Sequence, residues 1–427
     1  MLDKLKEILN LKSEFSKNVL TLVTGTTIAQ SIPIAISPIL TRIYTPEDFG
    51  VLALFISITT ILGTIANGRY ELAIVLPKRD NNALELTALS IIITMGFSLL
   101  LVILVILFHD SLLSYLNNDR FSFWLYLIPL SVLLFSLFNI LNYYHTRKKE
   151  YKTITKARMS RSVVMALIQT LVGLLFRVGG GLIGGSIVSY IVGNYVMLRN
   201  RIGKHIFGEI QASSLLQQGK RYINFPKYSL FGSLANILSI HVISIFITTV
   251  YSATILGFYS LVYRVLAMPL TLIGNSLGQV YLQEAVEEKN KTGITIVTFR
   301  STLIKLVAIT IPIFGILYLF IDDLFAFIFG NEWQIAGVYA KILLPLFFIR
   351  FIVSPLTVTC SIFEKQKIAL IWQAFFLVNI LLVFLISYLL EISFTDFLTA
   401  FNWFSFLQYL FILAIIIKLA RDGKLIK

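Results

Sequence analysis

One arginine lies in the middle of a long apolar stretch. Arg264 is the only charged residue of the segment GFYSLVYRVLAMPLTLIG. A guanidinium in hydrocarbon costs between about 2.5 and more than 10 kcal/mol by different measures, so such residues nearly always face a polar cavity or a partner. Because a guanidinium stays charged and its planar fork matches phosphate oxygens in pairs, the sequence predicts that Arg264 binds phosphate. A buried ion pair is the alternative.

Three further arginines are candidates for the same chemistry, each with a structural alternative. Arg350 lies in LFFIRFIVSPL, and the alternative is that its head group extends to the membrane interface. Arg69 lies in NGRYELAIVLPK, where the alternative is an ion pair with Glu71 across a turn. Arg42 lies in ILTRIYTPEDFG, where the alternative is that it caps the carboxyl end of its helix. The sequence leaves these alternatives open.

Two amides follow Arg264 along the chain. Asn275 and Gln279 lie one helical turn apart, and such side chains contact sugar hydroxyls or a coupling ion, although in membrane helices they more often bond to a neighbouring helix. The chain has one cysteine, Cys360, and the single histidine within an apolar run, His241, has no partner at a metal-ligand spacing. The sequence therefore predicts no catalytic residue and no metal site.

The composition shows what kind of scaffold must hold these residues. The chain has 427 residues, of which 57% are hydrophobic and 14% are charged, and its mean hydropathy is +0.83. Soluble domains have about 25% charged residues, so the composition excludes a soluble enzyme and a disordered protein. The net charge of +14 fits a negatively charged membrane surface better than nucleic acid.

Long apolar runs predict an all-α membrane protein. A helix of about 20 apolar residues crosses the hydrocarbon core, whereas barrel strands alternate over about ten residues each. The runs here are continuous, so we expect helices. The segment before them, 1–17, has apolar and lysine residues on different helical faces and predicts an amphipathic interfacial helix. Twelve spans are predicted at about 18–41, 48–68, 83–108, 121–143, 160–177, 181–198, 226–250, 254–282, 296–321, 336–363, 368–390 and 397–418.

Basic residues predict the orientation of these spans. Most of the 36 Lys and Arg residues fall in alternate connections, such as 144–161 and 199–228. Cytoplasmic loops are enriched in Lys and Arg, so the pattern supports twelve spans with both termini in the cytoplasm. The outer connections are short, and the longest are expected at 109–120 and 322–335. The exceptions are Arg42, Arg120, Arg177 and Lys341 in outer segments, and Arg264 and Arg350 within spans.

A repeat at an offset of 207 residues predicts two related halves. We expect an N-terminal lobe at 18–205 and a C-terminal lobe at 206–427, each with six spans, arranged with pseudo-symmetry around a central cavity. Parallel repeats of this kind occur in transporters whose halves move about a central site. The matched residues are Gly25 and Gly232, Ser37 and Ser244, Thr41 and Thr248, Tyr44 and Tyr251, Gly50 and Gly257, and Leu54 and Leu261.

Three stretches resemble a known family over essentially the whole chain. SPILTRIYTPEDFGVLALF, RYELAIVLPKRDNNALELTALS and YSLVYRVLAMPLTLIGNSLGQVYLQEA resemble bacterial Wzx-type O-antigen flippases of the multidrug/oligosaccharidyl-lipid/polysaccharide exporter superfamily. The resemblance implies that the protein flips undecaprenyl-pyrophosphate-linked oligosaccharide units, precursors of O-antigen or another surface polysaccharide, across the bacterial cytoplasmic (inner) membrane by alternating access. It also implies a cationic central cavity, to which position assigns Arg69 and Arg264, followed by Arg42 and Arg350.

The same resemblance implies how such a protein works and with what. It implies a transporter rather than an enzyme, with no cofactor, driven by a proton or sodium gradient. Asp and Glu are scarce within the spans, so no residue is assigned to this coupling. The implied partners are the lipid-linked oligosaccharide, membrane lipids and other polysaccharide assembly proteins, without nucleic acid.

Two other functions are weighed against the flippase. The first is a cation-coupled exporter of small molecules with the same architecture, whose positively charged cargo a cavity with Arg264 and few acids would repel. The second is a membrane-embedded polysaccharide polymerase or ligase. An enzyme of that kind is expected to have a sizeable outer loop with catalytic side chains, whereas the outer connections here are about a dozen residues long.

Overall fold

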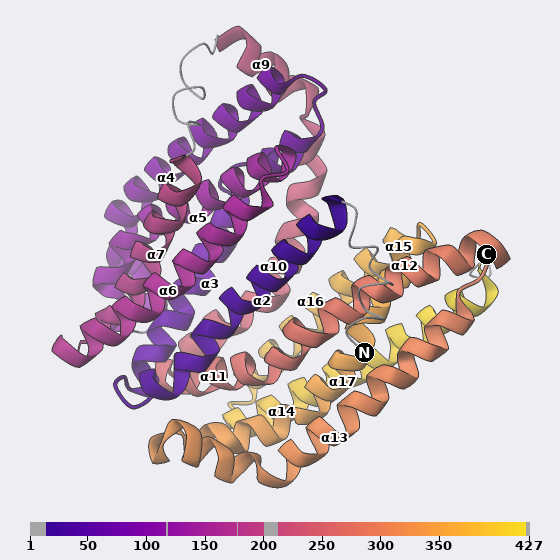
Figure 1. Ribbon diagram of the computed structural model, residues 1–427. Helices are drawn as coiled ribbons and strands as arrows, with labels where there is room; N and C mark the ends of the chain where they lie inside the picture. Colours follow the sequence, from indigo (N-terminus) through magenta and orange to yellow (C-terminus); the bar gives the residue numbers. More distant parts are fainter. Residues whose placement is uncertain (1–13, 117, 177, 200–211, 424–427) are drawn as a thin grey trace. The chain divides into compact units, whose positions relative to one another are not determined.

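The long apolar runs form helices (Figure 1). The structure is a computed structural model that describes residues 14–116, 118–176, 178–199 and 212–423. For residues 14–23, 212, 213, 275 and 276 it describes the backbone but not the side chain. The predicted amphipathic segment 1–17 lies almost entirely outside the described residues. Contacts divide the chain into two compact units, Met1–Ile237 and Leu238–Lys427, which we call unit 1 and unit 2.

Unit 1 contains the first six long helices and the start of the seventh. α6 packs against α2 and α7, and α5 packs against α3, α4 and α7. The elements are α2 (Glu14–Leu40), α3 (Pro46–Ile65), η1 (Tyr70–Val75), α4 (Asp80–Leu116), η2 (Asp119–Phe121), α5 (Ser122–Arg147), α6 (Tyr151–Phe176), α7 (Gly180–Leu198), α9 (Ala212–Arg221), η3 (Phe225–Ser229) and α10 (Leu230–Phe246), which continues into unit 2.

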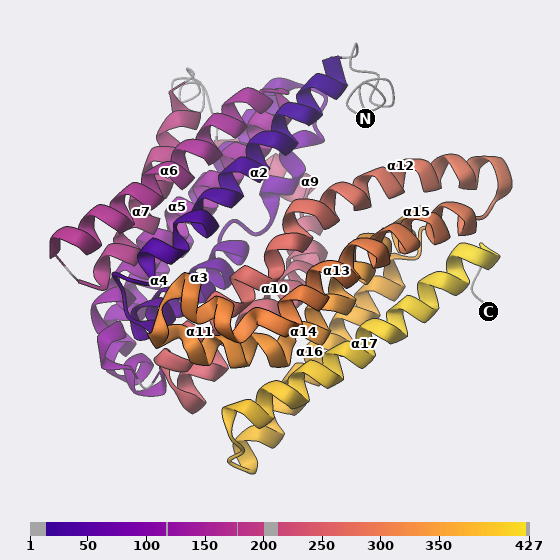
Figure 2. The same ribbon diagram turned by 60° about the horizontal axis from the view of Figure 1, so that its bottom comes forward.

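Unit 2 is built around α14. This helix packs against α11, α13 and α17, and Figure 2 shows α13, α14 and α17 side by side. The elements are η4 (Ile247–Tyr251), α11 (Ala253–Pro269), η5 (Leu270–Gly274), α12 (Asn275–Thr292), α13 (Ile296–Phe329), η6 (Asn331–Trp333), α14 (Gln334–Val353), η7 (Ser354–Val358), α15 (Thr359–Ile362), α16 (Gln366–Leu389) and α17 (Phe394–Asp422).

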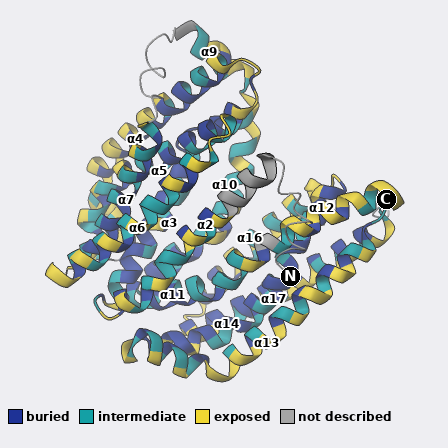
Figure 3. Cartoon of the chain, in the orientation of Figure 1, coloured by how far each residue is buried: buried dark blue, intermediate teal, exposed yellow. Residues whose placement is uncertain are grey.

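The predicted fold class is confirmed. The described residues form helices and no strands, and eleven helical segments are long and apolar enough to cross a membrane. The helix α2, 27 residues long, takes the place of the predicted first span. Large apolar side chains remain exposed on the outer faces of α4 and α13, for example Leu107, Leu319 and Phe327 (Figure 3). In a membrane, lipid tails cover such apolar faces, so exposing them on the surface of the bundle carries no hydrophobic cost.

Several helices extend beyond the predicted spans. Most of the two outer connections expected at 109–120 and 322–335 is helical, because α4 continues to Leu116 and α13 to Phe329. A hydropathy pattern shows only where an apolar run ends. The helix itself can continue into polar sequence, because its backbone hydrogen bonds do not require apolar side chains. In α4 the apolar run ends at a local distortion, since Phe108 has φ −117° and ψ 18°.

The helix α6 begins nine residues before its predicted span. The expected connection 144–161 is therefore much shorter, and Arg158 and Arg161 lie within a helix rather than in a loop. No glycine or proline interrupts the sequence from 151 to 172, so nothing stops the helix from extending over this basic segment.

The division into units falls later in the chain than the expected lobe boundary at 205/206. Residues after 211 pack on unit 1, because α9 lies against α4. Gln218 donates a hydrogen bond to Glu85 over 3.0 Å, and the Tyr70 hydroxyl donates to the carbonyl of Gly219 over 3.0 Å. The connection between the predicted sixth and seventh spans is thus partly anchored on unit 1.

The internal repeat is visible where a first helix turns into a second. Thr45 caps α3 by accepting a hydrogen bond from the Asp48 amide over 3.3 Å, and Ser252 caps α11 by accepting one from the Ile255 amide over 3.1 Å. These caps lie 207 residues apart, as do their donors. Hydroxyl caps of this type fix where a helix begins, so both corners are specified in the same way.

The tyrosine before each cap supports the same conclusion. Tyr44 donates to the carbonyl of Gln169 over 2.6 Å, and Tyr251 donates to the carbonyl of Ile392 over 3.2 Å. The Tyr44 hydroxyl thus connects the corner before α3 to α6, the fifth span of the first half. The Tyr251 hydroxyl connects the corner before α11 to the turn after α16, the fifth span of the second half. Glycine is required beside Tyr44, since a Cβ at Gly181 would lie 2.2 Å from the tyrosine oxygen.

The predicted orientation can be tested at two exposed positions. In a Cys360→Ser background, we expect Lys152→Cys, at the start of α6, to react with an impermeant maleimide only after the cells are opened. The matched variant Tyr115→Cys, at the far end of α4, is expected to react in intact cells. Tyr115 is 72% exposed. Labelling of Lys152→Cys from outside would reverse the orientation.

Candidate functional site

Two arginines of α6 lie inside unit 1. Arg158 donates from Nη1 to the hydroxyl of Thr26 on α2 over 2.7 Å, and from Nη2 to the amide oxygen of Asn142 on α5 over 3.3 Å. Both contacts are with neutral oxygens, which orient the guanidinium but do not neutralise its charge. Arg158 therefore presents a positive charge between three helices.

Arg161 lies one helical turn further along α6. Its guanidinium carbon lies 4.2 Å from the centre of the Tyr190 ring and 5.1 Å from that of Phe138, which is the geometry of a cation–π interaction. Like charges three residues apart on a helix repel each other. An anion bound by both guanidiniums would relieve this repulsion and would receive charge-assisted hydrogen bonds.

This pair was not predicted as a site from the sequence. Arg158 and Arg161 were expected in a cytoplasmic connection, because they precede the apolar run of the fifth span. A usable signal was present, since two arginines spaced as i and i+3 lead without a break into the run VVMALI. This spacing puts both on one helical face.

Arg69 and Glu71 form the ion pair that was the alternative for Arg69. Arg69 Nη1 lies 2.9 Å from Glu71 Oε1, at the start of η1. Glu71 is 1% exposed, and within the described part of the chain its Oε2 has no hydrogen-bond partner. Arg69 adopts a left-handed backbone conformation with φ +62°, which is uncommon for a residue other than glycine.

Burial controls the acidity of this carboxyl. Glu71 lies between the candidate spans, and its burial raises its pKa to about 7, while Arg69 acts in the opposite direction. Desolvation thus outweighs the neighbouring positive charge. The element η1, which carries the pair, packs against α5. The carboxyl of Glu71 changes its protonation state close to neutral pH.

Arg350 is held by aromatic side chains in unit 2. Its Nη1 donates to the Tyr263 hydroxyl over 2.9 Å, and its guanidinium carbon lies 5.5 Å from the Tyr263 ring centre and 5.7 Å from that of Phe347. The head group therefore points to α11 within the bundle. Tyr263 and Phe347, which hold this second cation, are both neutral.

The remaining predicted residues are more dispersed. Arg264 is half-buried in α11, next to Tyr263 in sequence. Arg42 is exposed and donates to the Pro38 carbonyl over 3.1 Å, as the helix-capping alternative predicts. Gln279 is exposed on α12, and the side chain of Asn275 lies outside those that the structure describes.

Several of the predicted residues lie on elements that pack against one another. Arg264 and Arg350 lie on α11 and α14, which pack against each other. In unit 1, Arg69 on η1 and the two arginines of α6 all lie on elements that contact α5. The part of Arg42, Asn275 and Gln279 in binding stays a prediction.

The arrangement of the helices resembles that of several solved membrane transporters. The chain superposes on the lipid II flippase MurJ in an inward closed conformation with a TM-score of 0.73 and 13% identity, covering 92% of this chain and 87% of MurJ. An inward-facing multidrug resistance MATE family transporter gives 0.60 and 13%, covering 95% and 96%. A transporter from Pyrococcus furiosus gives 0.60 and 14%, covering 95% and 96%. At these identities the similarity shows the fold alone.

The sequence identifies the family of the chain. The family described as polysaccharide biosynthesis protein matches residues 39–337, which is more than half of the chain. The chain belongs to this family. No curated protein matches the chain at a significant level.

Glu71 makes stability depend on pH in a defined direction. Its pKa in the folded protein, about 7, is above its ordinary value of 4.5, so the folded state holds the proton more tightly. The stability linked to this proton is complete below about pH 4.5 and is lost as the pH rises through 7. We expect wild-type thermal stability to fall from pH 5 to pH 8 relative to Glu71→Gln, by at most about 1.4 kcal/mol per pH unit.

The measurement is thermal unfolding of the purified chain over that pH range. Glu332→Gln is the matched control, because Glu332 is an exposed glutamate of η6 and its substitution should leave the pH profile unchanged. Parallel profiles for wild type and Glu71→Gln would show that Glu71 does not titrate in this range.

Proposed function

We propose that the chain flips undecaprenyl-pyrophosphate-linked oligosaccharides from the inner to the outer leaflet of the bacterial cytoplasmic membrane by alternating access. Family membership connects it with polysaccharide biosynthesis, and its fold is that of transporters and flippases. One structural observation carries the proposal. Both units of an apolar helical bundle hold guanidiniums by contacts with neutral groups, namely Arg158 and Arg161 in unit 1 and Arg350 in unit 2.

The chemistry of the cargo explains why such residues are needed. A polyprenyl tail can stay in lipid throughout, whereas a pyrophosphate cannot leave water without hydrogen bonds and opposite charge. Guanidiniums supply both, since they donate in pairs to phosphate oxygens. We assign this role to Arg158, Arg161, Arg264 and Arg350, and a supporting role to Arg69.

The environment of the protein follows from the same proposal. We infer that it resides in the cytoplasmic membrane with both termini in the cytoplasm, as the distribution of Lys and Arg predicts. Its direct partners are the lipid-linked oligosaccharide and the surrounding lipids, with other polysaccharide assembly proteins nearby. Coupling to a proton or sodium gradient stays a prediction.

Removing a half-buried guanidinium should slow translocation without unfolding the chain. We expect Arg264→Ala and Arg158→Gln to reduce translocation about ten- to a hundredfold, because a hydrogen bond to a charged group contributes about 1.5–3 kcal/mol. Arg264→Lys should recover part of the rate, because it keeps the charge but loses the planar fork.

The measurement uses purified protein in liposomes that contain a fluorescent undecaprenyl-pyrophosphate-linked saccharide. An impermeant quencher reports the leaflet, and chromatography of the extracted lipid reports whether its covalent structure has changed. Arg421→Ala is the matched control, because Arg421 is exposed and pairs with the adjacent Asp422. Full translocation by both variants would remove these residues from the site, and a covalently altered lipid would indicate an enzyme.

A further inference from the structure

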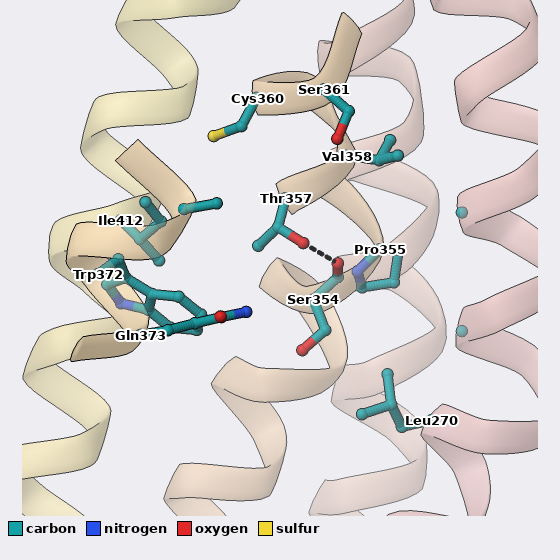
Figure 4. Close-up of a pocket in the computed structure, with 13 residues that line it drawn as sticks. Leu270, Ser354, Pro355, Thr357, Val358, Cys360, Ser361, Trp372, Gln373 and Ile412 are labelled. Carbon is teal, nitrogen blue, oxygen red and sulfur yellow. Dashed lines mark hydrogen bonds between the residues drawn. The ribbon is translucent and has the colours of Figure 1, made fainter. Parts of the chain in front are cut away.

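Unit 2 contains a cavity that the arginines do not occupy. It has a volume of about 400 Å³ (Figure 4). Its walls are formed by residues of six elements, namely η5, α12, η7, α15, α16 and α17. We call it the hydroxyl pocket and define it by its side chains able to bind a ligand: Ser354, Thr357, Ser361, Trp372 and Gln373. Sites for small molecules typically measure about 300–1,000 Å³, whereas one water needs about 30 Å³. The hydroxyl pocket is therefore large enough for a small organic group.

The chemistry of the hydroxyl pocket selects a neutral polar ligand. All the described residues that line it are uncharged, so it offers a phosphate no opposite charge and a cation no carboxylate. Its hydroxyls and amide both donate and accept hydrogen bonds, which a lipid tail cannot use. A sugar ring matches this lining, since its hydroxyls pair with such groups and its C–H face packs on an aromatic ring.

The polar side chains are positioned by the surrounding helices. Thr357 donates to the Ser354 carbonyl over 2.7 Å, which leaves the lone pairs of its oxygen free to accept. The indole N–H of Trp372 donates to the Gln408 carbonyl over 3.3 Å, and this bond fixes the plane of the half-buried ring. Figure 4 shows Trp372 and Gln373 projecting from α16 toward the hydroxyls of η7.

The hydroxyl pocket begins one helical turn after Arg350 along the chain. Ser354, the first residue of η7, donates its backbone N–H to the carbonyl of Arg350. The Arg350 guanidinium lies against Tyr263 of α11, and α11 leads into η5, which lines the hydroxyl pocket. With a phosphate at Arg350, the group attached to it would extend along α14 and η7 toward the hydroxyl pocket. In a lipid-linked saccharide that group is the first sugar.

We propose that the hydroxyl pocket binds the sugar nearest the phosphate of the transported lipid-linked saccharide. This inference rests on the proposed function and adds a binding subsite to it. Arg350 contacts the phosphate and sets the register, while Trp372 and Gln373 contact the sugar. The two parts of the head group are thus recognised by different chemistry, charge for the phosphate and neutral hydrogen bonding with stacking for the sugar.

The test compares two lipids on the full-length protein. Undecaprenyl pyrophosphate bearing one N-acetylglucosamine and undecaprenyl pyrophosphate without sugar are titrated into the chain in lipid nanodiscs. We expect the wild type to prefer the sugar-bearing lipid, and Trp372→Ala to weaken that lipid about tenfold while leaving the sugar-free lipid unchanged. Trp372→Phe, which keeps an aromatic face, should retain most of the preference.

A second measurement uses the only cysteine of the chain, Cys360, which also lines the hydroxyl pocket. Its reaction with methyl methanethiosulfonate, which forms a methyl disulfide on the cysteine and releases methanesulfinate, should be slowed by the sugar-bearing lipid and not by the sugar-free one. Equal wild-type affinities for the two lipids, or an equal loss of both in Trp372→Ala, would overturn the inference. Translocation in liposomes separates the two proposals: a chain that flips the sugar-bearing lipid but shows no preference lacks only the subsite, whereas a chain that flips neither lipid is not the flippase.

Discussion

The site depends on one physical constraint: each arginine carries a permanent positive charge, and the surrounding apolar helices have a low dielectric constant. Burying an ion without compensation costs several kcal/mol or more, and the usual remedy is a carboxylate partner. Arg158 instead meets a threonine and an asparagine, Arg161 two rings, and Arg350 a tyrosine hydroxyl. Such contacts orient the guanidinium and lower part of the cost but leave its charge available. An anion that entered the bundle could therefore pair with these guanidiniums, as the proposed function requires.

The helices hold these charges at fixed positions. Each guanidinium reaches across to a second helix, from α6 to α2 and α5, and from α14 to α11. The repeated corners, capped by Thr45 and Ser252, fix where α3 and α11 begin. Long helices with short connections pair most backbone groups within the helix, as a membrane requires. The same architecture that satisfies the backbone thus sets the geometry of the side chains.

The sequence predicted the helices better than it predicted the site. Apolar runs identify spans because hydrocarbon selects them directly, and Arg264 stood out for the same reason. Arg158 and Arg161 were missed because the helix that carries them extends past the apolar run. Trp372 and Gln373 were missed because they meet Ser354 and Thr357 only through packing of helices distant in sequence. Hydropathy is a property of one segment, whereas a site is made by several.

Arg69 differs from the other arginines because its partner, Glu71, is an acidic residue. Their pairing satisfies Arg69 within η1, so this guanidinium must leave Glu71 before it can bind another anion fully. A carboxyl whose pKa burial raises to about 7 is neutral for part of the time near neutral pH, and the neutral form holds Arg69 less strongly. Arg158 and Arg350 need no such release, because a hydroxyl or amide yields to a phosphate at little cost. Neutral partners thus allow binding to be both charge-assisted and reversible, and a transporter that must release its cargo requires both.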